Sequence, residues 1–120
     1  MPNQVVWFDI PVVDLDRAIK FYSAILGAPI KKDSHPGMTM GILPHGENDV
    51  GGCLYVMEGE TPSPQGPLLY FNCQGRLDAA IAEVAKNGGK ILQEKHQIGP
   101  YGFRAVAVDS EGNRIALHSK

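Results

Sequence analysis

Residues 5–27, VVWFDIPVVDLDRAIKFYSAILG, decide the fold because they read as one strand followed by one helix that ends at glycine. Apolar side chains stand at every second position at the start, namely Val6, Phe8 and Ile10, and this period of two predicts a strand that packs one face. Asp14 is expected to cap the helix and Gly27 to end it in the left-handed conformation. Between them a stripe at three- and four-residue steps predicts a helix lying on a sheet: Leu15, Ala18, Ile19, Tyr22, Ile25 and Leu26.

The second half of the chain repeats this pattern. A shift of 62 positions superimposes Leu15 on Leu77 and Gly27 on Gly89, among other matches. Each half reads as a strand, a helix and three further strands. The sequence therefore predicts an α+β fold of two tandem βαβββ modules, residues 1–58 and 68–120, joined by the Gly- and Pro-rich linker 59–67.

Composition excludes several classes of partner. A net charge of −2 with no basic run argues against nucleic acid, and no apolar run is long enough to cross a membrane. Residues 1–4, MPNQ, do not resemble the start of a signal peptide, so we expect a cytoplasmic protein. Cys53 and Cys73 are expected to be small buried hydrophobes rather than a disulfide.

Alternation along the strands also predicts which side chains face away from the helices, into a cup formed by the two sheets. These are Trp7, Asp9, Leu68, Tyr70, Asn72, Arg114, Ala116 and His118. Asp9 and His118 are the candidates for proton transfer, although Asp9 could instead pair with Arg114 and His118 could lie at the rim. Tyr101, in the turn GPYG, is either a lid over the cup or a surface aromatic.

Two segments resemble the vicinal oxygen chelate superfamily, which includes glyoxalase I, extradiol dioxygenases and bleomycin resistance proteins. They are DLDRAIKFYSAILG at residues 14–27 and DSEGNRIALHS at residues 109–119. The resemblance covers essentially the whole chain and implies the glyoxalase fold. It is closest to small bacterial glyoxalase-related proteins.

The resemblance also implies where metal ligands would stand, one on the first and one on the last strand of each module. Three of these positions hold Trp7, Leu68 and Ala116, and the fourth holds Leu54, or Cys53 if the register is off by one. Trp, Leu and Ala offer no donor to a metal ion, so we expect no metal and no other cofactor. The four histidines at 35, 45, 96 and 118 are scattered, and only His45-Gly46-Glu47 has ligand-like spacing.

Three functions remain open from the sequence. The first is a bleomycin-resistance-like protein that binds a small organic molecule in the cup without chemistry. The second is a metal-independent isomerase or lyase acting on a small carbonyl metabolite, with Asp9 as acid or base. The third is an enzyme that holds a metal at other residues. Trp7 is expected to form an aromatic wall with its N–H free for a ligand oxygen, or else only to fill the space that a metal would occupy and so close the cup. We also expect a homodimer, with the cup closed either within one chain or between two.

Overall fold

The computed structural model describes residues 3–120, the side chain of His35 excepted. Met1 and Pro2, which belong to the expectation about a signal peptide, lie outside the described residues. The first module runs β1 Trp7–Pro11, α1 Leu15–Leu26, β2 Lys31–His35, β3 Met38–Ile42 and β4 Gly51–Tyr55. The second runs β5 Leu69–Asn72, α2 Leu77–Lys86, β6 Lys90–Gln97, the short 3-10 helix η1 Gly99–Tyr101, β7 Phe103–Val108 and β8 Arg114–Ser119.

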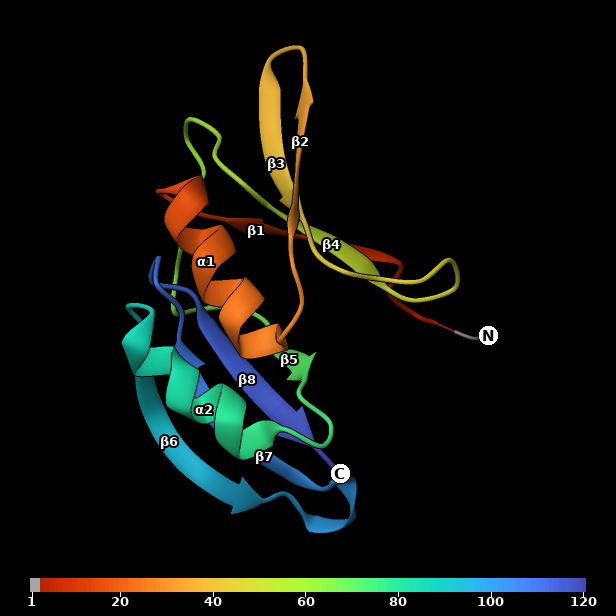
Figure 1. The fold of residues 1–120 in the computed structure, drawn as a ribbon, viewed down its shortest axis with the longest axis vertical. Coiled ribbons are helices and arrows are strands. Elements are labelled where there is room, and N and C mark those ends of the chain that lie inside the picture. Colours follow the sequence, from red (N-terminus) through yellow and green to blue (C-terminus); the bar gives the residue numbers. More distant parts are fainter. Residues whose placement is uncertain (1–2) are drawn as a thin grey trace.

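The strands form two sheets with the same topology. Their orders are β1-β4-β3-β2 and β5-β8-β7-β6. In each sheet the first strand pairs in parallel with the last, and the other neighbours are antiparallel. This arrangement confirms the predicted α+β fold of two βαβββ units (Figure 1).

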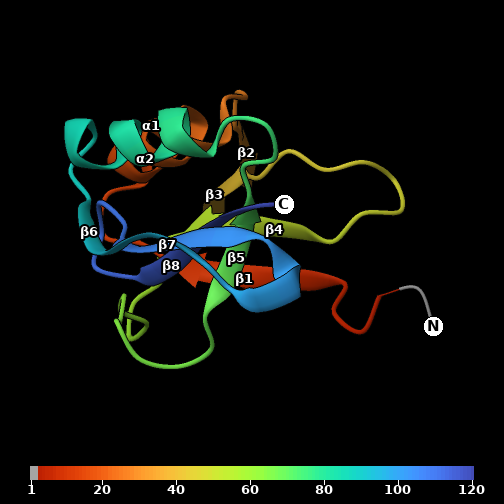
Figure 2. The same ribbon diagram turned by 90° about the horizontal axis from the view of Figure 1, so that it is seen from below.

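Both helices lie on the same side of the two sheets and pack against each other (Figure 2). Side chains from both modules meet beneath them in one hydrophobic core, in which Tyr22 and Phe8 each contact the ring of Phe71. We call the other face of each sheet, turned away from the helices, its open face. Among residues 3–120 no helix is long and apolar enough to cross a membrane.

The predicted ends of α1 are confirmed. The Asp14 side chain accepts a hydrogen bond from the backbone N–H of Arg17 at 3.1 Å, and Gly27 has φ 66°. The second module also holds both ends of this helix. Arg76 donates to the carbonyl oxygens of Ala24 and Ile25 at the C-terminal end, where a cation is favoured by the helix dipole.

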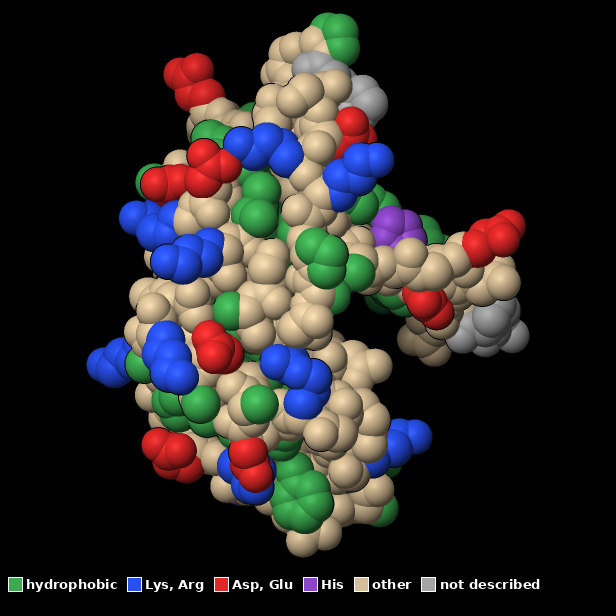
Figure 3. All heavy atoms as spheres, viewed as in Figure 1, with side chains coloured by type: hydrophobic (Ala, Val, Ile, Leu, Met, Phe, Trp, Pro, Cys, Tyr) green, Lys and Arg blue, Asp and Glu red, His purple; other side chains and the backbone are tan. Residues whose placement is uncertain are grey.

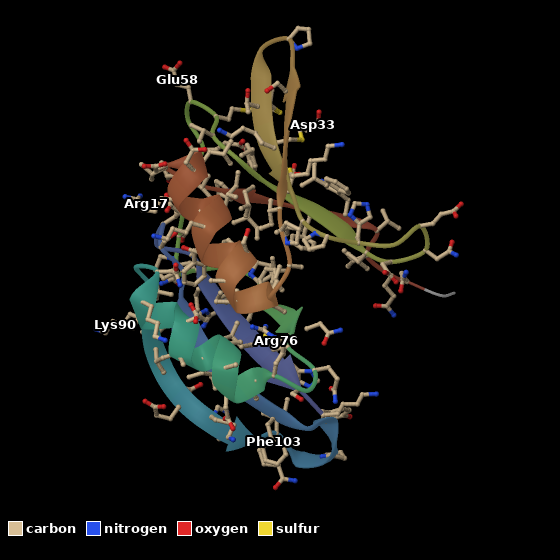
Figure 4. The ribbon with its side chains drawn as sticks, viewed as in Figure 1. Arg17, Asp33, Glu58, Arg76, Lys90 and Phe103 are labelled. Atoms are coloured by element: carbon tan, nitrogen blue, oxygen red, sulfur yellow. The ribbon has the colours of Figure 1, made fainter. Side chains whose placement is uncertain are left out.

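At the N-terminal end of α1, the Glu111 carboxylate accepts from the backbone N–H groups of Val13 at 3.0 Å and Asp14 at 2.8 Å. It also pairs with the side chain of Arg17. Figure 4 shows Arg17 and Arg76 near opposite ends of α1. The two modules are therefore joined by charged side chains as well as by the core.

The turn between β7 and β8 is organised by Asp109, which is 2% exposed. One of its carboxylate oxygens accepts the backbone N–H groups of Glu111, Gly112 and Asn113. The other accepts the phenol of Tyr22 at 2.5 Å. Burial first, and then the charge of Asp109, raises the pKa of Tyr22 well above its usual value. This turn, part of the segment 109–119 that resembles the superfamily, is thus a structural joint between the modules.

Candidate functional site

The open face of the first sheet carries a cluster around Asp9. The indole N–H of Trp7 donates to Asp9 Oδ1 at 2.8 Å, and the thiol of Cys53 donates to the same oxygen at 3.2 Å. The ring of His45 packs edge-on against Trp7, with centroids 5.9 Å apart, and its Nδ1 donates to the carbonyl of Leu43. Asp9 therefore has two donors bound before any ligand arrives.

Two groups on β4 have raised pKa values. Burial, and then the hydrogen bond to Asp9, raises the pKa of the Cys53 thiol to about 12. Burial, followed by the hydrogen bond with Glu60, raises the pKa of Tyr55 to about 12. Both groups stay protonated at neutral pH and act as hydrogen-bond donors rather than as bases or nucleophiles.

Two expectations for this face need correction. Leu54 is fully buried in the hydrophobic core, and Cys53 takes the position on the open face because the register differs by one residue. The Trp7 N–H is not free for a ligand, since Asp9 accepts it. The Trp7 side chain remains 43% exposed, so its ring is still accessible.

The open face of the second sheet carries a cationic and aromatic cluster. Arg104 donates through Nη1 to the hydroxyl of Tyr70 and through Nε to His96 Nε2 at 3.0 Å, and its guanidinium lies 5.8 Å from the centre of the Tyr70 ring. His118 Nε2 donates to the backbone carbonyl of Tyr101 at 2.6 Å. A pocket of about 450 Å³ is lined by Tyr70, Arg104 and His118, together with Ile98 and Tyr101.

The hydrogen bonds leave specific donors for this pocket. The Tyr70 oxygen accepts from Arg104, so its own O–H proton can be given to another group. His96 donates through Nδ1 to the carbonyl of Glu94 and accepts through Nε2, which fixes the neutral tautomer and leaves the positive charge on Arg104. The arrangement is suited to an anionic group beside an aromatic ring.

Other predicted site residues of the second module have different surroundings. Ala116 lies between Tyr70 and Val106 in the sheet and is fully buried, so it offers a ligand no surface in this chain. Leu68 is half-buried just before β5. Asn72 is exposed, and its side-chain oxygen accepts the backbone N–H of Gln74 at 2.9 Å.

Asp9, His118 and Arg114 are not brought together as one catalytic group. Among the described residues no hydrogen bond or ion pair joins Asp9 to either of the other two. Arg114 donates through Nη2 to the carbonyl of Gly66 in the linker at 3.1 Å. Asp9 and His118 therefore lie on different open faces, and Arg114, which lines one pocket with Asp9, stands at the boundary between the modules.

A metal site does not fit the residues at the superfamily's ligand positions. Trp7, Leu68 and Ala116 have no lone pair to offer, which leaves the thiol of Cys53 as the one ligand type among the four positions. Within residues 3–120, the side chain of His35 excepted, no three His, Cys, Asp or Glu side chains are grouped as metal ligands. The residues at these four positions therefore do not fit the superfamily's metal site.

Sequence reasoning did not identify Arg104 or His96. Arg104 alternates with the buried Ala105 in FRAVAV, so the period-2 signal was present in β7. His96 lies on β6, whose pairing with β7 has register shifts, and simple alternation does not locate it.

Comparison with known proteins shows the family to which the chain belongs. A family model described as the glyoxalase/bleomycin resistance protein/dioxygenase superfamily matches residues 4–117. The chain therefore belongs to this superfamily.

Individual relatives are distant. A glyoxylase-like domain-containing protein of Didymella fabae is 31% identical over 125 residues, which covers 96% of this chain and 92% of that protein. The protein CFP32 of Mycobacterium bovis, whose name includes the word glyoxylase, is 30% identical over 112 residues. This match covers 90% of the chain and only 41% of CFP32.

Solved structures support the fold. A glyoxalase/bleomycin resistance protein from Albidiferax ferrireducens T118 has a TM-score of 0.76 at 23% identity, covering 98% of this chain and 99% of that one. Trypanothione-dependent glyoxalase I of Leishmania major has a TM-score of 0.66 at 24% identity, covering 98% and 86%. At these identities the likeness concerns architecture, and reaction varies widely within one fold.

Proposed function

We propose that this protein binds a small aromatic or amphipathic organic anion on the open face of its second sheet, without a metal. The observation that carries the proposal is the pocket in which the Arg104 guanidinium and the Tyr70 hydroxyl lie together beside the ring of Tyr101. A carboxylate would accept from the guanidinium and the phenol O–H, and its ring would pack on the tyrosines.

The open faces also support a homodimer. Trp7 on the first open face is 43% exposed, and Tyr70 and Tyr101 on the second are 48% and 73% exposed. Large apolar side chains gathered on one side of a protein are typical of an interaction surface. The outer edge strands β2 and β6 carry lysines, which disfavour edge-to-edge pairing, so we infer that a second copy covers the faces rather than these edges.

Charge supports the same arrangement. The first open face carries Asp9, and the second carries Arg104. A two-fold dimer that sets the first sheet of each copy against the second sheet of the other brings these opposite charges toward one cup. Trp7 would then form part of the ligand site.

A screen with benzoate, salicylate and phenylacetate, followed by backbone amide shifts, tests the proposal. We expect the anions to give saturable shifts at Tyr70, Arg104 and His118, and benzyl alcohol to give none. Weaker binding in Trp7→Ala would indicate a site shared by both open faces, and unchanged binding would confine it to the second sheet. Shifts confined to other parts of the chain would refute the proposed site.

The screen also bears on the alternative, a metal-independent isomerase or lyase. Asp9 is exposed and can reach a solvent-side ligand, which is the observation in its favour. Turnover of a carbonyl compound that is lost in Asp9→Asn, with binding retained, would establish chemistry. Binding without turnover would support sequestration. One transition metal ion per chain, by elemental analysis of the purified protein, would contradict metal-free function.

A further inference from the structure

A second pocket lies in the seam between the modules, away from the 450 Å³ pocket on the second open face. We use "seam pocket" for this cavity of about 340 Å³, which lies between β1, the start of β5 and β8, and the linker. Its size is at the lower end of the range of about 300–1,000 Å³ that small-molecule sites occupy. The walls are largely apolar and come from Phe8, Ile10, Leu69 and Ile115.

Arg114 is the unusual member of this lining. Its Nε is buried and makes no hydrogen bond with any described residue, although Nη2 donates to the carbonyl of Gly66. A buried donor on a charged group is destabilising unless an acceptor reaches it. The Arg114 guanidinium therefore lines the seam pocket with one of its donors unsatisfied.

The linker forms one side of this pocket and is held in place. The backbone N–H of Ser63 donates to the side-chain oxygen of Asn113 at 3.1 Å, and the Asn113 amide donates to the carbonyl of Pro11 at 2.9 Å. The hydroxyl of Ser63 accepts from the backbone N–H of Gln65, so its own proton can still be donated. A second donor thus stands in the pocket lining with Arg114.

Asp9 also lines the seam pocket, and its charge opposes an anion there. Its Oδ1, however, is bound by Trp7 and Cys53 on the open face of the first sheet. These two donors offset part of its negative charge.

We propose that the seam pocket is a separate binding site for a small aliphatic carboxylate. The carboxylate accepts from the Arg114 guanidinium, and the hydrocarbon lies against Phe8, Ile10, Leu69 and Ile115. The proposal does not depend on the function assigned to the open face, because it involves neither Arg104 nor Tyr70.

Three matched probes test it: 4-methylpentanoate, the alcohol 4-methylpentan-1-ol, and L-leucine, which adds an ammonium group to the same acid. Backbone amide shifts of labelled protein are followed during each titration. We expect 4-methylpentanoate to give saturable shifts at Ser63, Gln65 and Ile115. The alcohol should bind about tenfold more weakly, because the charge-assisted hydrogen bond is lost. Equal binding of the alcohol, or tighter binding of L-leucine, would overturn the proposal, the latter by assigning recognition to Asp9.

Variants provide the second arm. Arg114→Met should weaken 4-methylpentanoate by about tenfold, and Arg104→Met, on the second open face, should leave it unchanged. If Arg114→Met does not fold, the ranking of the probes on the wild-type protein still decides. Shifts that map to Tyr70 and His118 instead of the linker would overturn the assignment of the site.

Discussion

Glu111 accepts two hydrogen bonds from the Arg17 side chain, at 2.7 and 2.9 Å, although 94 residues separate the two in sequence. Together with Arg76 at the other end of α1, this pair holds the helix of the first module through side chains of the second. The signs agree with the helix dipole, since the acid meets backbone N–H groups and the base meets carbonyl oxygens.

Glu111 predicts a dependence of stability on acid. Burial raises its pKa, but the hydrogen bonds from Arg17, the Asp14 backbone, Ser110 and the Val13 backbone outweigh burial, and its pKa falls from 4.5 to about 2. A carboxyl whose pKa is lower in the folded state stabilises the fold fully above its unfolded pKa. This contribution is lost as the pH falls from 4.5 toward 2.

Glu111→Gln should therefore lower the free energy of unfolding at neutral pH by about 2 kcal/mol. The contribution of the ion pair to this value is small, because the Arg17 side chain is half exposed and water screens its charge. The variant should also flatten the acid limb of the curve. Urea titrations at a series of pH values measure both effects. Asp16→Asn, which removes an exposed pair with Lys32, is the control and should change stability by less than about 0.5 kcal/mol. An unchanged acid limb in Glu111→Gln would contradict this account.

The sequence predicted the local features of β1 and α1 but not the side-chain contacts that join the two modules. The Asp14 cap, Gly27 and the alternation in β1 are signals within a few residues, and all three are confirmed. Contacts such as Glu111 with Arg17 join distant segments and leave no periodic pattern. Periodicity likewise gives the side of the sheet on which Asp9 or His118 lies, but not whether the two open faces meet.

Gly27 should tolerate alanine poorly. Its φ of 66° is strained for any other residue, and an added Cβ would lie 2.8 Å from Cζ of Arg76. Gly37 has φ 82°, and no atom lies within 4 Å of a Cβ added there. Gly37→Ala therefore measures the cost of the backbone strain alone. Thermal unfolding should show Gly37→Ala destabilised by about 1 kcal/mol and Gly27→Ala by roughly twice that. Equal losses would mean that the Arg76 contact contributes nothing.

The two cysteines should be unreactive in the folded protein. Burial raises the pKa of both thiols, that of Cys53 to about 12 with a further contribution from Asp9. At mildly alkaline pH, a thiol reagent should modify neither residue until denaturant is added. Asp9→Asn should speed modification of Cys53 but not of Cys73, because it removes one of the two main causes at Cys53. Rapid modification of native Cys53 would contradict the hydrogen bond to Asp9.

The proposed dimer predicts a mass of two chains in sedimentation at micromolar concentration. Tyr101→Glu should shift the protein toward monomer, because Tyr101 is 73% exposed and the hydrogen bond from His118 uses its backbone carbonyl, which the substitution keeps. Ala79→Glu, at an exposed position on α2, should remain dimeric. A wild-type monomer, or equal effects of both variants, would refute an interface on the open faces.

Binding of an aromatic carboxylate at Arg104 tests the central claim most directly. The tightest anion among benzoate, salicylate and phenylacetate should be titrated into wild type, Arg104→Met and Arg114→Met by calorimetry, with folding checked by amide spectra. The account predicts that Arg104→Met weakens binding by about tenfold and Arg114→Met leaves it within about twofold of wild type. Affinity unchanged in a folded Arg104→Met protein would contradict the proposed function.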